Sequence, residues 1–67
     1  MKPCPLSSRQ IEILGWQSQG KTSVETAAIL GLSPRSIESH TLRAKNVTGA
    51  ATLTALVAMA LRNGWMQ

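Results

Sequence analysis

Apolar residues recur at helical spacing in four segments of the chain, and turn-forming residues separate these segments. None of the segments alternates apolar and polar residues as a half-buried strand would. A hydroxyl residue that can cap a helix stands before each segment, at Ser7, Thr22, Ser33 and Thr52. The pattern therefore predicts an all-α protein, a compact domain of four helices.

The first two helices are predicted to begin in the same way, with a capping box. In the first, the hydroxyl of Ser7 pairs with Gln10, and Gly20 stands where a left-handed residue ends the helix. In the second, Thr22 pairs with Glu25. This second helix is only about eight residues long, so it needs tertiary packing to be stable.

The second and third helices form a recognisable unit. A three-residue link joins them, and the third helix is expected to cover residues 34–46. Ala27 allows close approach of the two helices, Gly31 makes the turn, and Ile37 packs the third helix onto the second. A short helix, a tight turn and a longer helix are typical of a helix-turn-helix. An ordinary antiparallel helical hairpin is the alternative.

Sixty-seven residues suffice for one small domain and leave no length for a second. We expect residues 1–5 to form an extended segment and residues 6–67 to form the domain. The longest apolar stretch, residues 50–61, is too short to span a bilayer. The sequence therefore predicts no membrane partner.

Side chains that perform catalysis or bind metals are scarce. One His and one Cys cannot supply four ligands to zinc, and with three Glu and no Asp neither a carboxylate pair nor a Ser-His-Asp triad can be assembled. We therefore predict no catalytic residue, no metal site, no cofactor and no enzymatic activity. A lone thiol cannot form an internal disulfide, which favours the reducing cytoplasm.

The charge of the chain indicates a polyanionic partner. Seven Lys and Arg residues against three Glu give a net charge of +4, and the pI is about 10.3. The basic residues are dispersed along the chain, which favours a folded basic face over a disordered basic arm. Two Trp without other aromatic residues make a poor stacking platform for single strands, so duplex DNA is the expected partner.

Several short motifs carry a resemblance to a known family. They are Gly20-Lys21-Thr22, Glu25-Thr26-Ala27, Leu30-Gly31-Leu32-Ser33, Ser36-Ile37-Glu38-Ser39-His40 and Gly64-Trp65-Met66. The chain resembles the LuxR-type (GerE-like) helix-turn-helix domain of bacterial transcription regulators, from Leu6 to Met66. Trp16 and the first of these motifs are similar to the quorum-sensing branch of the family.

The resemblance implies a sequence-specific regulator of transcription that binds duplex DNA as a dimer. Its recognition helix, residues 34–46, would lie in the major groove. We expect DNA contacts from the start of the second helix and from the start and exposed face of the third: Lys21, Thr22, Ser33, Arg35, Ser36, Glu38, Ser39, Leu42 and Arg43.

Two residues of the third helix depart from the family pattern. Related activators often carry a basic residue at the position of Glu38 and frequently at that of Leu42. Glu38 can accept a hydrogen bond from a cytosine amine, and Leu42 can contact a thymine methyl group. The alternative for Glu38 is a solvated charge that repels phosphate. A third departure is Thr26, where the family prefers an aliphatic residue.

The last helix is apolar nearly all round. Leu53, Leu56, Val57 and Ala60 form a core stripe, and further apolar residues cover much of the remaining surface. A terminal helix of so small a domain cannot bury both sides in its own core, so we expect it to pair with a second copy. The resemblance implies the same homodimer, and the expected contacts are Ala55, Ala58, Met59 and Arg62. The alternative is simple helix propensity of an Ala-rich segment.

A second function, of another class, stays open. In that interpretation the fold and the last helix are kept, but Glu38 and Leu42 prevent DNA recognition. The chain would then be a protein-interaction module that pairs with a full-length LuxR-type relative and blocks it.

Overall fold

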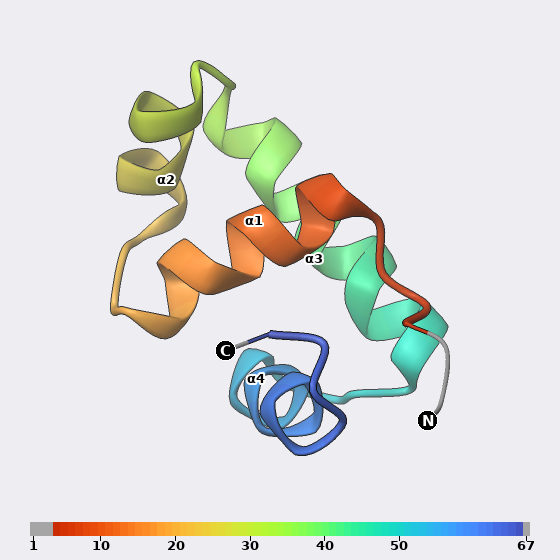
Figure 1. Cartoon of the computed structure of the whole chain (residues 1–67). Coiled ribbons are helices and arrows are strands. Elements are labelled where there is room, and N and C mark those ends of the chain that lie inside the picture. Colours follow the sequence, from red (N-terminus) through yellow and green to blue (C-terminus); the bar gives the residue numbers. More distant parts are fainter. Residues whose placement is uncertain (1–3, 67) are drawn as a thin grey trace.

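The computed structural model describes residues 4–66 and contains four helices (Figure 1). They are α1 (Ser8–Ser18), α2 (Ser23–Leu30), α3 (Pro34–Thr48) and α4 (Leu53–Arg62). No strand occurs in this part of the chain, which confirms the all-α prediction. Residues 1–3 of the expected extended segment and residue 67 of the expected domain lie outside the described residues, so those boundaries stay predictions.

The predicted caps are all present, because each depends on residues only three positions apart. The Ser7 side chain accepts from the backbone N–H of Gln10 at 3.1 Å, and the Gln10 amide oxygen accepts from the Ser7 N–H at 2.8 Å. Thr22 and Glu25 make the same reciprocal pair at 3.1 and 2.9 Å. Ser33 and Thr52 cap α3 and α4 through their hydroxyl oxygens.

The end of α3 differs from the prediction by two residues. The helix continues beyond Asn46 to Thr48, whose hydroxyl donates to the carbonyl of Ala44 at 2.8 Å. Gly49 then takes a φ of +77°, and its N–H donates to the carbonyl of Lys45 at 2.8 Å. The left-handed glycine therefore ends the helix, later than the apolar pattern alone indicated.

The second and third helices form a helix-turn-helix, as predicted. Gly31 has a φ of +69°, which lets the chain turn immediately after α2. The N–H of Leu32 donates back to the carbonyl of Ala27 at 2.9 Å and closes the turn. Ala27 and Ile37 are 2% and 0% exposed, so both lie in the core where the two helices meet.

The core consists of two clusters, and α3 contributes to both. The smaller, which we call the turn cluster, lies beneath the helix-turn-helix and contains Ile13, Ala27 and Ile37. The larger, which we call the α4 cluster, contains Leu6, Leu14, Ala44, Ala50, Leu56, Ala60 and Met66. Because α3 contacts each of the other helices, it is the central element of the domain (Figure 1).

The helices are short for a membrane span. Within residues 4–66 no single helix is long and apolar enough to cross a membrane. Only together are α3 and α4 long and apolar enough, and the chain bends by 60° between them. Each helix also contributes buried residues to the core of the domain, Ile37 and Ala44 from α3 and Leu56 and Ala60 from α4.

Candidate nucleic-acid interface

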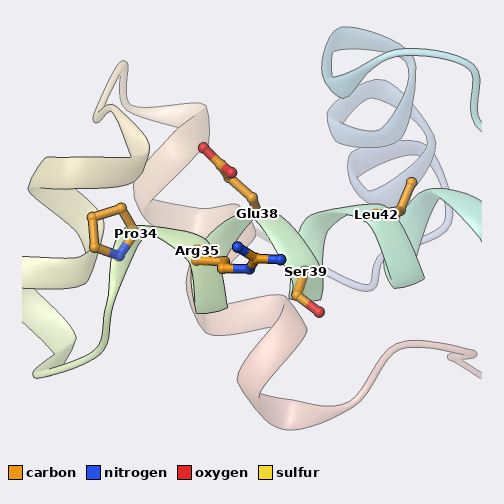
Figure 2. Close-up of a pocket in the computed structure, with 5 residues that line it drawn as sticks. All are labelled: Pro34, Arg35, Glu38, Ser39 and Leu42. Carbon is orange, nitrogen blue, oxygen red and sulfur yellow. The ribbon is translucent and has the colours of Figure 1, made fainter.

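The exposed face of α3 gathers most of the predicted DNA contacts. Arg35, Glu38, Ser39 and Leu42 are spaced at three and four residues, so they share one side of the helix. With Pro34 they line an open hollow of about 610 Å³ (Figure 2). The opposite side of α3 is held in the core by Ile37 and Ala44. Burial of that side therefore fixes which side chains point outward.

The charged groups on this face are not neutralised by each other. Figure 2 shows the Arg35 guanidinium lying between Glu38 and Ser39, which point to opposite sides. Within residues 4–66 the one ion pair joins Arg9 and Glu12 on α1, at 3.0 Å. Arg35 and Glu38 thus both keep their hydrogen-bonding capacity for a partner.

The other predicted contacts on α3 have different surroundings. Arg43 is exposed and follows Ser39 by one turn, so it extends the face toward the C-terminal end of the helix. The Ser33 hydroxyl accepts from the N–H of Ser36 at 3.1 Å and is therefore engaged as the N-cap. Ser36 is half-buried. These two serines are better suited to positioning the helix end than to reading bases.

One residue of the same face was not among the predicted contacts. Asn46 is exposed and lies one turn beyond Leu42, in line with Arg35 and Ser39. Its amide carries a donor and an acceptor, the pair that matches the edge of adenine. The helical spacing from Arg35 would have been enough to include it.

The start of α2, where Lys21 and Thr22 were expected to contact DNA, already carries an anion. The Thr22 N–H donates to the Glu25 carboxylate at 2.9 Å, and this hydrogen bond lowers the pKa of Glu25. The Thr22 side chain and Lys21 lower that pKa further. By contrast, α3 has no acidic residue in its first turn. A phosphate is therefore opposed by a carboxylate at the start of α2 but not at that of α3.

The side of α4 that faces away from the core carries an apolar strip, formed by Ala55, Ala58 and Leu61. Ala55, Ala58 and Arg62 are exposed as expected, but Met59 is half-buried and packs against the α4 cluster. Leu61, outside the predicted contact set, is 52% exposed. An uncharged groove of about 360 Å³ runs between α4 and the end of α1, lined by Gln17, Ser18, Leu53, Thr54, Val57, Ala58 and Leu61.

Comparison with known proteins gives consistent matches. Residues 4–60 match the family model of bacterial regulatory proteins, luxR family. The chain is 42% identical over 59 residues to the HTH-type quorum sensing-dependent transcriptional regulator RpaR of Rhodopseudomonas palustris, covering 88% of this chain and 24% of that protein. It is 38% identical over 58 residues to the transcriptional activator protein BjaR1 of Bradyrhizobium diazoefficiens, covering 87% and 24%.

A third relative is the transcriptional activator protein AhyR of Aeromonas hydrophila, 36% identical over 59 residues, with 88% and 23% covered. The chain thus spans about a quarter of the length of these relatives. No solved structure matches it.

Proposed function

Because the chain belongs to the luxR family of bacterial regulatory proteins, we propose that it binds duplex DNA sequence-specifically, as a dimer, and regulates transcription. In this proposal α3 lies in the major groove, with its exposed face against the base edges. The names of its relatives, a quorum sensing-dependent regulator and two activators, support the same role.

The observation that carries the proposal is the exposed face of α3. Its polar and charged side chains project from a helix whose other side is buried, and the chain has a net charge of +4. An α-helix fits the major groove, and basic residues on either side of it meet the phosphates. We assign Glu38, Ser39 and Leu42 to base edges, and Lys21, Arg35 and Arg43 to phosphates.

The remaining predicted contacts act through the helix ends. Thr22 lies at the N-terminus of α2, and Ser33 and Ser36 lie at that of α3. Backbone N–H groups and the helix dipole favour a phosphate at a helix N-terminus, although Glu25 opposes it at the start of α2. The start of α3 is the stronger of the two because no carboxylate stands in its first turn. We call the exposed face of α3, with Arg35, Glu38, Ser39, Leu42 and Arg43, the reading face. Phosphate contacts at the helix ends set the position of this face along the duplex.

The salt dependence of binding tests this function. Gel-shift titrations against random-sequence duplexes at two salt concentrations give the slope of affinity against salt. Lys21→Ala and Arg43→Ala are each expected to weaken binding to all duplexes and to lower that slope by about one unit. Arg9→Ala removes the same charge from a side chain paired with Glu12, and serves as the matched control.

Two results would contradict the assignment. If Arg9→Ala lowers the slope of affinity against salt as much as the other two variants do, the protein binds DNA by general charge attraction and not through these specific contacts. Absence of binding to any duplex at low salt would refute DNA binding itself. It would favour the second function, a module that pairs with a full-length LuxR-type relative.

For the dimer we propose the outward side of α4, with Ala55, Ala58 and Arg62 in the contact. The exposed Leu61 strengthens this assignment, whereas the half-buried Met59 contributes mainly through the core. Leu61→Glu is expected to weaken self-association on the order of tenfold, because it places a charge in an apolar contact. Ile29→Glu, on the exposed surface of α2, is the control. Sedimentation that finds both variants equally associated would contradict this interface.

A further inference from the structure

Glu38 and Leu42 form a ridge on the reading face of α3. Both line the open hollow beside Arg35 and Ser39 (Figure 2). Both also line a second hollow, of about 240 Å³, on their other side, together with Gln17, Lys45 and Leu53. Side chains that border hollows on both sides stand above their surroundings. In a DNA complex these two would meet the base edges ahead of their neighbours.

The chemistry of the ridge is unusual for a surface that approaches a polyanion. Glu38 offers only hydrogen-bond acceptors when ionised, and Leu42 offers a branched alkyl group that is 55% exposed. A carboxylate among phosphates is costly unless it receives a donor. The ridge is therefore suited to a base step that presents an amine beside an apolar group.

The amine and the apolar group that suit the ridge are found on cytosine and thymine in the major groove. Cytosine exposes its N4 amine, with a C–H group beside it, whereas the N6 amine of adenine stands next to the N7 acceptor. A carboxylate is therefore attracted to the cytosine edge and partly repelled by the adenine edge. Thymine alone exposes a methyl group, which matches Leu42.

The spacing of the two residues sets the spacing of the bases. Four residues of an α-helix rise about 6 Å, and successive bases rise about 3.4 Å along a strand. Glu38 and Leu42 therefore reach base pairs that are one or two steps apart.

We propose that Glu38 and Leu42 select a cytosine and a thymine one or two base steps apart in each DNA site, an inference that rests on the proposed DNA binding. Arg35, which precedes Glu38 by three residues without pairing to it, holds the adjacent phosphate and keeps the carboxylate in the groove.

Selection of bound duplexes from a random pool tests the inference. The unaltered protein is expected to enrich a site that contains the cytosine and the thymine. Replacing the cytosine there should weaken its binding about fivefold to 150-fold. For Glu38→Gln that loss should shrink, and the selected base should shift toward adenine, whose N6 and N7 atoms match an amide.

Deoxyuridine in place of the thymidine removes only the methyl group. The unaltered protein should lose roughly fourfold in affinity, the value of one buried methyl group, while Leu42→Ala should lose less. Glu12→Gln, which removes an acidic charge from α1, is the matched control and should select the same site as the unaltered protein.

The outcomes separate the two proposals. If Glu38→Gln binds selected and scrambled duplexes more tightly by the same factor and enriches an unchanged site, Glu38 is a repulsive charge. Base selection is then overturned while DNA binding stands. Selection of the thymine is overturned in the same way if deoxyuridine weakens the unaltered protein and Leu42→Ala equally. If the unaltered protein binds no duplex at low salt, both the proposed function and this inference fail. Circular dichroism of each variant verifies that these exposed positions leave the fold intact.

Discussion

The two ends of α3 are supported very differently. Its N-terminal half rests on the turn cluster, with Ile13 and Ala27 packed around Ile37. Its C-terminal half enters the α4 cluster. This cluster also contains residues of α1 and α4, of the link between α3 and α4, and of the segments before α1 and after α4. The N-terminal part of the reading face, with Arg35, Glu38 and Ser39, lies at the end with the smaller support. Stability of the domain and placement of the reading face should therefore respond to different substitutions.

The largest effect is expected in the α4 cluster. Leu56→Ala should lower the free energy of unfolding by about 2–5 kcal/mol, because it removes a side chain that is 1% exposed. A chain this small has little more stability than that. Urea or thermal denaturation followed by circular dichroism measures the loss. At a protein concentration where the chain is monomeric, Leu61→Ala makes the same change on the exposed side and should cost about 0.5 kcal/mol or less. Equal losses would contradict the division of α4 into two sides.

A smaller change at the other end tests placement of the reading face. Ile37→Val should cost about 0.5–1.5 kcal/mol and should weaken binding to every duplex, because Ile37 fixes α3 on α2. Ile11→Val makes the same change in a residue packed against the α4 cluster. At a matched loss of stability it should leave DNA affinity nearly unchanged. Equal affinities for the two variants would show that the turn cluster has no separate role.

The next largest effect is a gain in the stability of the fold, from a substitution on α2. The hydroxyl of Thr26 is fully buried and has no hydrogen-bond partner among residues 4–66. Thr26→Val replaces it with a methyl group and should raise the free energy of unfolding by about 1 kcal/mol. Thr48→Val should have the opposite sign, because the Thr48 hydroxyl donates to Ala44 and accepts from the Ala50 N–H. A loss of stability in Thr26→Val would show that its hydroxyl is satisfied.

The smallest effect is a dependence of stability on pH that is expected for the cap of α2, which contains Glu25, and not for that of α1, which contains Gln10. The hydrogen bond from Thr22 lowers the pKa of Glu25 from its ordinary 4.5 in the folded state. Glu25 therefore stabilises the fold above that pH, and its contribution is lost as the pH falls through the lower folded value. Glu25→Gln should keep the cap, as Gln10 does on α1, and flatten this acid dependence. Denaturation between pH 3 and 6 measures how the free energy of unfolding depends on pH, with Glu12→Gln as the control. If Glu25→Gln shows the same pH dependence as the unaltered protein, the assignment is contradicted.

Local features of the fold were predictable because they depend on nearby residues. The caps at Ser7, Thr22, Ser33 and Thr52 need only a hydroxyl and a backbone N–H three positions on. The core stripe of α4 followed from helical spacing, and Leu56 and Ala60 are indeed buried. The helix-turn-helix followed from the same kind of short-range pattern.

Features that depend on how distant segments meet were not predictable in the same way. Met59 was grouped with the exposed residues of α4, yet it packs against the α4 cluster, to which Trp65 and Met66 also belong. The period of a helix does not show where the chain after it returns. For the candidate site, spacing identified the outward side of α3, but the choice among its exposed residues required chemical reasoning and left out Asn46.

The continuity of α3 has a consequence for the proposed DNA site. It is one uninterrupted helix of 15 residues, about 22 Å long, that joins the α4 cluster to the reading face. If two copies pair through α4, each α3 passes the geometry of that contact rigidly to its own half-site. The two half-sites must then face the same side of the duplex, with centres a whole number of turns of about 10 base pairs apart. An insertion of about five base pairs between them would turn one half-site away, and an insertion of about ten would restore it.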